Sequence, residues 1–118
     1  LTLSHNDWDT IDAGAMDMFT TRRNRTAFDA LTLRPRFLRT VEERNLSTTV
    51  LGEKISMPVV LAPAGSHMRA HQEGEVATAR GAGMSDTLMM LSTSSNFSME
   101  EVSQAASGPL WFQLYHRG

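Results

Sequence analysis

Three short apolar runs, separated by two segments of helical character, constrain the fold of this chain more than any other feature. The runs are residues 57–63 (MPVVLAP), 87–92 (TLMMLS) and 110–115 (LWFQLY). A short continuous apolar run is typical of a strand that is buried on both faces of a sheet. Strands that alternate with helices form parallel sheets, so the order strand, helix, strand, helix, strand predicts an α/β fold.

The two intervening segments carry helix signals of their own. Residues 71–84 are rich in alanine, and Glu73 and Glu75 lie near the start, where the helix dipole favours carboxylates. His71 and Glu75 have the i, i+4 spacing of a metal pair, but a capped and solvated helix start is the favoured interpretation. The second helix is expected to begin at Ser98, because Ser98 and Glu101 form the Ser-x-x-Glu pattern of a capping box.

The chain before the first apolar run has a different texture. Residues 17–31 are predicted to be helical, with Asp17 as the N-cap and an end before Pro35, and the residues around that proline are expected to be extended. Residues 46–57 predict a β-hairpin in which residues 52–54 supply the turn. We therefore expect two parts: an N-terminal helical segment with a hairpin over residues 1–56, and two βα units plus a third strand over residues 57–118.

Composition narrows the class of protein. The 118 residues suffice for one domain at most, and a net charge of −2 disfavours a nucleic-acid partner. The chain has no cysteine, so disulfides, thiolate metal sites and a cysteine nucleophile are excluded, and no metal site is expected. No apolar run nears the roughly 18 residues that span a bilayer, and we do not expect the first residues of this sequence to be a signal peptide. We expect a cytoplasmic protein, with peripheral membrane association left open, and Leu1 in place of Met suggests a missing start.

Polar and backbone-special residues gather where the three predicted strands end. They are residues 62–65 (APAG), residues 92–95 (STSS), and the pair Gln113 and Tyr115. Parallel α/β folds place their ligand sites at the carboxyl ends of strands. No G-x-G-x-x-G pattern follows the first strand, which disfavours a dinucleotide-binding sheet and favours a βα-barrel.

Each of these residues also has an explanation that involves no ligand. Gln113 can be a satisfied core amide, and Tyr115 can be a core tyrosine whose hydroxyl reaches the rim. Ser92 and Pro63 can simply end their strands. The agreement of three separate strand ends favours a binding site, but the residues taken one by one leave both interpretations open.

Several segments, in order along the chain, resemble the FMN-dependent α-hydroxy-acid oxidases and dehydrogenases, a family that includes glycolate oxidase, lactate oxidase and mandelate dehydrogenase. The matching segments are residues 13–31 (AGAMDMFTTRRNRTAFDAL), 34–38 (RPRFL), 46–65 (LSTTVLGEKISMPVVLAPAG), 71–80 (HQEGEVATAR), 88–102 (LMMLSTSSNFSMEEV) and 111–115 (WFQLY). Together they cover nearly all of the chain from Ala13 onward.

The resemblance implies a fold and a chemistry. The fold would be the N-terminal segment and the first three strands of a (β/α)8 TIM barrel, incomplete without the remaining chain. The family oxidises a small 2-hydroxy acid to a 2-oxo acid, with proton abstraction by a base and hydride transfer to FMN. The base, the substrate-binding arginines and the flavin-contacting lysine of the family would all lie outside this chain, which alone would be inactive.

The resemblance also assigns roles to residues of this chain. The backbone of Ala62, Pro63 and Ala64 would lie beside the reactive edge of the flavin. Ser92 would hydrogen-bond the ring, and Gln113 would bind its pyrimidine edge, since an amide offers both a donor and an acceptor. Tyr115 would face the substrate and is the catalytic candidate of this chain.

Three positions depart from the family pattern or leave it open. Thr10 stands where the family usually has a substrate-binding tyrosine. Gly65 stands where several oxidases have alanine and mandelate dehydrogenase has glycine, so oxidase and dehydrogenase both stay possible. Ser94 replaces a residue that is bulky in some members, which suggests a roomier pocket. His116 is not expected to be the base, because it follows Tyr115 on the opposite face of the strand.

Two other functions compete with the enzyme. The chain could be a half-barrel without catalysis that pairs with a partner chain, or part of another βα-barrel that binds FMN or a phosphate. As an enzyme, it would need a small 2-hydroxy-acid substrate and the C-terminal part of the barrel, as a second chain or a missing segment. We also expect a homo-oligomer and no nucleic-acid partner.

Overall fold

A computed structural model describes residues 3–40 and 42–116 of the chain. The described residues divide into two compact units, residues 3–43 and residues 44–116. This division, between residues 43 and 44, lies earlier in the chain than the boundary that we expect between residues 56 and 57. The expected boundary marks where the barrel begins in the sequence, and it stays a prediction. Each unit is described by itself below.

The first unit contains two short helices and no buried residue in either. Helix α1 (His5–Asp12) begins at Ser4, whose hydroxyl accepts a hydrogen bond from the Asp7 backbone N–H at 3.1 Å. Helix α2 (Phe19–Thr26) continues into a 3₁₀ turn, η1 (Ala27–Ala30). The predicted helix over residues 17–31 is therefore present in a shorter form, whereas α1 was not predicted.

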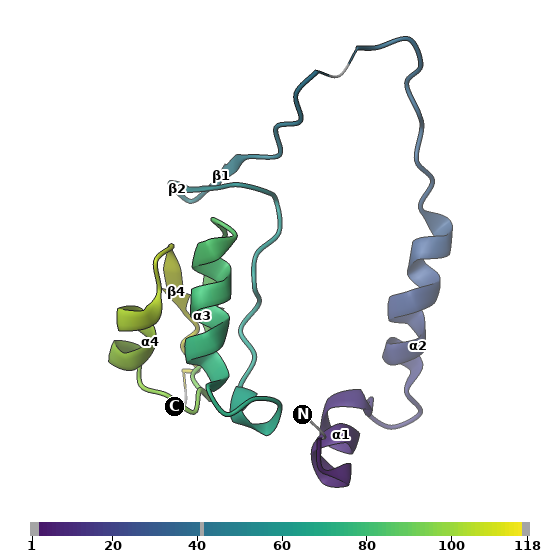
Figure 1. Ribbon diagram of the computed structural model, residues 1–118. Helices are drawn as coiled ribbons and strands as arrows, with labels where there is room; N and C mark the ends of the chain where they lie inside the picture. The colour runs from purple at the N-terminus through teal and green to yellow at the C-terminus, as the bar shows by residue number, and fades with distance from the viewer. Residues whose placement is uncertain (1–2, 41, 117–118) are drawn as a thin grey trace. The chain divides into compact units, whose positions relative to one another are not determined.

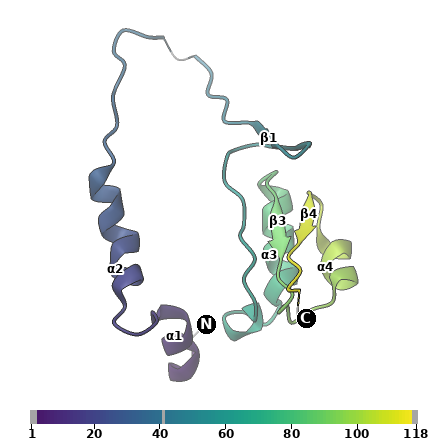
Figure 2. The ribbon, with the colours of Figure 1, turned by 180° about the vertical axis from the view of Figure 1, so that it is seen from behind.

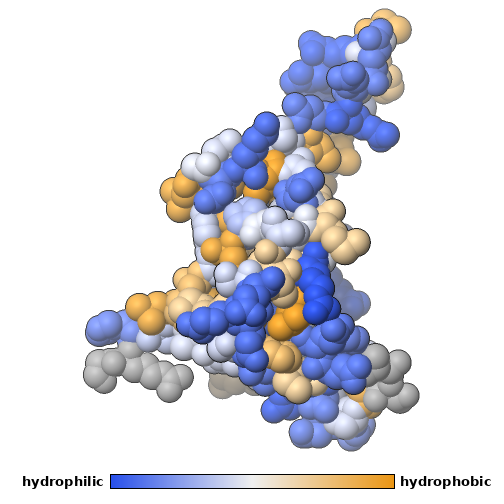
Figure 3. All heavy atoms as spheres, turned by 60° about the vertical axis from the view of Figure 1, so that its left-hand side comes forward, coloured by the Kyte–Doolittle hydropathy of each residue, from blue (hydrophilic) through white to orange (hydrophobic). Residues whose placement is uncertain are grey.

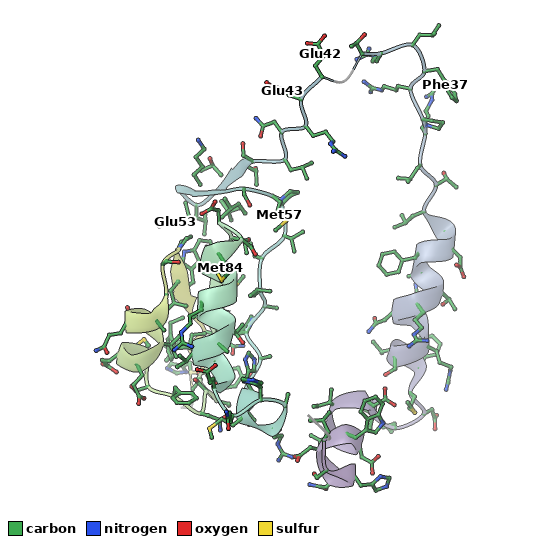
Figure 4. All side chains as sticks on the ribbon, in the orientation of Figure 1. Phe37, Glu42, Glu43, Glu53, Met57 and Met84 are labelled. Atoms are coloured by element: carbon green, nitrogen blue, oxygen red, sulfur yellow. The ribbon has the colours of Figure 1, made fainter. Side chains whose placement is uncertain are left out.

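The N-cap of α2 differs from the prediction. Met18, in the left-handed conformation with φ 56°, occupies the position expected for Asp17. Its N–H donates to the Ala15 carbonyl oxygen at 2.9 Å, so a tight turn rather than a carboxylate cap begins the helix. After η1, residues 31–40 form neither helix nor strand, and the extended conformation expected around Pro35 stays a prediction. Figure 4 shows Phe37 projecting from this segment, and 82% of its surface is exposed.

The second unit begins with the predicted hairpin. Strands β1 (Thr48–Val50) and β2 (Glu53–Ile55) pair antiparallel, with Thr48 opposite Ile55. The turn consists of Leu51 and Gly52, which have φ values of 47° and 92°, and not of residues 52–54 as predicted. Two successive positive φ values match the twist of the strands, so the turn closes in two residues and Glu53 is already part of β2.

The predicted βαβαβ order is largely confirmed. A 3₁₀ turn, η2 (His67–Arg69), precedes α3 (Gly74–Met84), which begins three residues later than predicted. Strand β3 (Met89–Leu91), helix α4 (Met99–Ala105) and strand β4 (Leu110–Phe112) follow. The predicted capping box of Ser98 and Glu101 is confirmed at the start of α4.

Strands β3 and β4 are parallel, with Met89 opposite Leu110, and lie side by side in Figure 2. The first predicted strand, residues 57–63, is reduced to a single parallel bridge between Leu61 and Met89. Pro58 and Pro63 have no N–H to donate, which limits the ladder on either side of Leu61.

The core of the second unit lies between the helices and one face of the sheet (Figure 1). It is built from Ala79 and Ala82 of α3, Met89 and Leu91 of β3, and Val102 of α4. On the opposite face, Met90 and Trp111 lie side by side in the register and are only half-buried. The sheet therefore has one face covered by helices and one face available for further packing.

The hairpin is fastened to the turn between α3 and β3. Ser56 N–H donates to the Asp86 carbonyl oxygen at 2.8 Å, and Ser56 Oγ donates to the Ser85 carbonyl oxygen at 2.7 Å. Ile55 is buried, with 1% of its surface exposed. The hairpin thus closes the end of the unit where β3 begins, and the opposite end of the strands carries the candidate site.

Candidate functional site

The strand register aligns two of the predicted site residues. Leu61, Met89 and Leu110 lie opposite one another in the parallel sheet. Continuing the register of β3 and β4 toward their carboxyl ends places Ser92 opposite Gln113, and we group with them, as one row, Ala64, which follows the isolated bridge at Leu61 by three residues. Ser92 and Gln113 belong to the face of the sheet that the helices do not cover, because side chains alternate between faces along a strand.

Ser92 and Gln113 are in direct contact. Ser92 is buried, and its Oγ donates a hydrogen bond to Gln113 Oε1 at 3.4 Å. Ser92 Oγ also accepts a hydrogen bond from the Ser94 backbone N–H at 3.1 Å. Gln113 extends the ladder one residue beyond β4, since its N–H donates to the Leu91 carbonyl oxygen at 2.8 Å. Within the described residues Gln113 Nε2 has no hydrogen-bond partner, so two amide N–H donors are free to bind a ligand.

The segment Ala62–Ala64 presents its backbone rather than large side chains. Ala62 and Ala64 are exposed, and no hydrogen bond of their backbone N–H groups is found within the described part of the chain. The segment is held at both ends, because Met90 N–H donates to the Leu61 carbonyl oxygen at 2.9 Å and Ser66 N–H to the Ser94 carbonyl oxygen at 3.1 Å. A flat ring can therefore approach these amides closely.

Gly65 brings this segment against the loop that follows β3. A Cβ atom placed on Gly65 would lie 2.7 Å from Ser94 Cβ and 2.9 Å from the Ser94 carbonyl oxygen. These distances are below van der Waals contact, so the two loops as they lie in this chain leave no space for a methyl group on residue 65.

Tyr115 lies two residues beyond Gln113, and half of its surface is exposed. Its backbone N–H donates to Thr93 Oγ1 at 3.1 Å, and Thr93 Oγ1 donates in turn to the Gln113 carbonyl oxygen. Thr93 was not singled out by the sequence, although it lies within the predicted cluster of residues 92–95.

Glu75 is the second residue whose surroundings sequence reasoning missed. It was expected at a solvated helix start but is fully buried, which corrects that prediction. Its Oε1 accepts the His67 backbone N–H at 3.2 Å, whereas Oε2 has no partner within the described residues. The signal was present in the sequence, because Glu75, Ala79 and Ala82 have the i, i+4, i+7 spacing of the buried stripe of a helix.

The neighbours of Glu75 do not form a metal site. No cluster of three or more His, Cys, Asp or Glu residues that could hold a metal ion occurs in residues 3–40 and 42–116. His71 is exposed, and its Nδ1 accepts the Glu73 backbone N–H at 3.2 Å. Glu73 pairs with Arg80 at 2.8 Å, and this hydrogen bond and the charge of the guanidinium lower the pKa of Glu73.

Two candidates remain, one in each unit. Thr10 lies in α1 of the first unit, where its hydroxyl donates to the Asn6 carbonyl oxygen at 2.8 Å. His116 is exposed beyond the end of β4. Within the second unit, His116 makes no described hydrogen bond to Ser92, Gln113 or the Ala62–Ala64 segment.

Comparison with known proteins identifies the family. The sequence model of the FMN-dependent dehydrogenases matches residues 2–118. The chain belongs to this family, so the resemblance inferred from the sequence is confirmed.

The proteins of similar sequence include glycolate oxidases. Glycolate oxidase 3 of Oryza sativa subsp. indica is 47% identical over 108 residues, which are 92% of this chain and 29% of that protein. Glycolate oxidase of Spinacia oleracea is 44% identical over the same shares. The chain thus spans under a third of the length of these relatives.

Solved structures agree. A lactate oxidase of Pediococcus acidilactici matches with a TM-score of 0.91 and 35% identity over 96% of this chain and 32% of that one. A soluble mutant of the membrane-associated (S)-mandelate dehydrogenase of Pseudomonas putida matches with the same TM-score, identity and shares. These are (β/α)8-barrel flavoenzymes, so the predicted fold, the N-terminal segment and first three strands of such a barrel, is confirmed. In the described part of the chain, no helix has the length and apolar character needed to cross a membrane.

FMN is the cofactor of the family, and the donor set of this chain suits it. The ring of a flavin has a polar edge with both donors and acceptors, and the free amide donors of Gln113 lie in one row with Ser92 and the open backbone of Ala64. The small residues of the segment 62–65 leave space for a flat group. The residues present therefore fit the flavin.

Proposed function

We propose that this chain forms the FMN-binding first part of an oxidoreductase that converts a small 2-hydroxy acid to a 2-oxo acid. The observation that carries the proposal is the contact between Ser92 and Gln113, just beyond the carboxyl ends of the parallel strands β3 and β4, in a chain of the FMN-dependent dehydrogenase family. Activity requires the completed barrel, by which we mean this chain together with the remaining strand–helix units, in the same polypeptide or in a second chain.

Each residue of the row has a distinct task in this proposal. Gln113 donates from Nε2 to the polar edge of the ring, while its Oε1 is held by the Ser92 hydroxyl. Ser92 thereby sets the direction in which the amide donors point. The backbone N–H groups of Ala62 and Ala64, which have no partner within the described residues, face the ring along its edge. FMN, when bound, supplies the acceptor for the hydride.

Tyr115 is the residue of this chain that we assign to the substrate. It lies two residues beyond Gln113 and past the end of β4, and its backbone N–H donates to Thr93 Oγ1 at 3.1 Å, which supports a position next to the site. A phenol at this position donates one hydrogen bond to the carboxylate or the reacting oxygen of a hydroxy acid. Such a bond accelerates the reaction when it becomes stronger as charge develops in the transition state.

The test is the substitution Gln113→Leu in the completed barrel, prepared from its natural source or by joining this chain to the part of a glycolate oxidase that follows the matched region. Leaving the polar edge of the ring unpaired costs about 1–3 kcal/mol, so FMN should dissociate roughly tenfold to a hundredfold more readily. Gln104→Leu is the matched control, because Gln104 is an exposed amide on α4. Equal flavin retention in the two variants would contradict the proposal.

The role of Tyr115 has its own measurement. Tyr115→Phe should bind FMN normally but reduce it at least about tenfold more slowly in anaerobic stopped-flow, equivalent to ~1.4 kcal/mol. Reduction at the wild-type rate would show that this residue does not serve the substrate.

A second function is favoured by one observation, the open edge of the sheet. A hollow of about 350 Å³ lies between α4 and β4 and is lined by Leu91, Met99 and Phe112, among others. Figure 3 shows apolar atoms reaching the surface on this side of the molecule. A half-barrel that only assembles with a partner chain would use the same edge. The purified complex of such a half-barrel would lack the visible absorption of oxidised flavin. The purified enzyme must show this absorption.

Assembly and location complete the proposal. The relatives are hydroxy-acid oxidases, and we infer for this protein a small 2-hydroxy-acid substrate, a homo-oligomeric state and no nucleic-acid partner. We also infer a cytoplasmic location, in agreement with the cysteine-free composition. Light scattering of the completed barrel and fractionation of the source cells test the state and the location.

A further inference from the structure

Thr93 connects the end of one strand to the end of the next through a single hydroxyl group. Its Oγ1 donates to the carbonyl oxygen of Gln113 and accepts the backbone N–H of Tyr115 at 3.1 Å. A hydroxyl has one hydrogen to donate and lone pairs with which to accept, so both bonds form at once and each has a fixed direction.

The segment that Thr93 holds lies beyond the regular sheet. Strand β4 ends at Phe112, and the ladder continues only to the N–H of Gln113, which donates to Leu91. Beyond that point Thr93 Oγ1 provides the hydrogen bonds of the Gln113 carbonyl oxygen and the Tyr115 amide that are found in the described chain. The direction of the Tyr115 side chain therefore depends on a bond made by the neighbouring strand end.

Ser92 and Thr93 bind different parts of the segment 113–115. The hydroxyl of Ser92 holds the amide side chain of Gln113, and the hydroxyl of Thr93 holds the backbone on both sides of Leu114. Leu114 itself is 74% exposed in this chain and does not belong to the core cluster of the described residues.

We propose that Thr93 is a positioning residue, which orients Tyr115 toward the substrate by holding residues 113–115 in place. The inference rests on the function proposed above for Tyr115. It assigns no contact between Thr93 and the substrate or the flavin. The group required is a hydroxyl, so Thr93→Ser should preserve the function and the isosteric Thr93→Val should remove it.

The first experiment measures the held segment directly, by hydrogen–deuterium exchange of the completed barrel with FMN bound. In Thr93→Val the amide of Tyr115 should exchange about tenfold faster or more, because its acceptor is lost, whereas Thr93→Ser should match the wild type. Thr48→Val is the control for the same chemical change, since Thr48 is exposed in β1. Unchanged exchange at Tyr115 in Thr93→Val would overturn the proposal.

The second experiment is a double-mutant cycle on flavin reduction with Thr93→Val and Tyr115→Phe. If Thr93 acts through Tyr115, adding Thr93→Val to the Tyr115→Phe variant should slow flavin reduction little or not at all. The effects of the two substitutions on the rate are then not additive. Additive effects would overturn the proposal, because they would mean that Thr93 acts independently of the phenol. Thr93→Ala replaces Thr93→Val in both experiments if the valine variant does not fold.

The two proposals fail in different ways. If Tyr115→Phe reduces its flavin at the wild-type rate, the substrate role of Tyr115 is wrong, and the exchange experiment still decides whether Thr93 holds the segment. If the Tyr115→Phe variant reduces its flavin slowly but the Thr93→Val variant reduces it at the wild-type rate, the proposed function stands and the positioning role of Thr93 is wrong.

Discussion

The close approach of Gly65 to Ser94 leads to the sharpest prediction for this chain. In Gly65→Ala the new methyl group would lie 2.7 Å from Ser94 Cβ and 2.9 Å from the Ser94 carbonyl oxygen. Carbon atoms without a bond between them pack at about 3.5–4.0 Å, so one loop must move by roughly half an ångström or more. The backbone carbonyl cannot rotate away as a side chain would, and the Ser66–Ser94 hydrogen bond of 3.1 Å must lengthen.

The cost follows from known effects of overpacking. Inserting a methyl group into a filled space destabilises a protein by about 1–3 kcal/mol. The displaced segment is Ala62–Ala64, which we assign to the flavin, so the loss should concentrate at the cofactor. We expect FMN to be released from the completed barrel at a lower temperature in Gly65→Ala, as measured by the fluorescence of free flavin.

Gly81→Ala is the matched control, because it makes the same chemical change where, apart from the backbone of its own helix and its chain neighbours, no described atom lies within 4 Å of the new methyl group. Gly81 is exposed inside α3, where alanine is favoured over glycine by about 0.5–1 kcal/mol. The control should retain FMN as well as the wild type or slightly better. Equal release temperatures for Gly65→Ala and Gly81→Ala would refute the argument from close approach.

Three further predictions concern stability. Glu75→Leu should lower the free energy of unfolding in urea by about 1–3 kcal/mol, because the His67 N–H loses its buried acceptor. Glu75→Gln keeps an oxygen at this place and should lower the free energy less. Equal losses in the two variants would contradict the role of the Glu75 oxygen. Val102→Ala should cost about 2 kcal/mol in the same assay, because Val102 is fully buried, while Val59→Ala at a half-exposed site should cost much less. Hydrogen bonds from Ser98 lower the pKa of Glu101, so the stabilisation of α4 is fully present above the ordinary glutamate value and is lost as the pH falls through the lowered one. Amide exchange in the first turn of α4 should show this pH dependence, and Glu101→Gln should abolish it.

The sequence predicts those elements whose signals are local. The capping box at Ser98 and the alternation of apolar runs with helices are both visible within a few residues, and both are present in the structure. The first strand was predicted from an apolar run alone, but its two prolines interrupt the ladder and leave only the bridge at Leu61. The N-cap at Met18 was missed because a left-handed residue without a side-chain cap leaves no pattern in the sequence.

The candidate site was predictable where chemistry coincides with a strand end. Ser92 and Gln113 were named from the sequence, and the structure places them in contact. Thr93 and Glu75 were missed for different reasons. The role of Thr93 depends on a register between two strands that is not visible in either one, and an acidic residue in the first turn of a helix is normally exposed.

The fastening of the hairpin to the turn before β3 has a practical consequence for engineering. The anchor at Ser56 lies where β3 begins, whereas the site residues lie where the strands end. The hairpin tip at Leu51 is 88% exposed, and Gly52 has open space around it. Exposed turns accept inserted sequence with little loss of stability. A fluorescent reporter or affinity tag placed between Leu51 and Gly52 would therefore follow assembly of the barrel from the end remote from its chemistry.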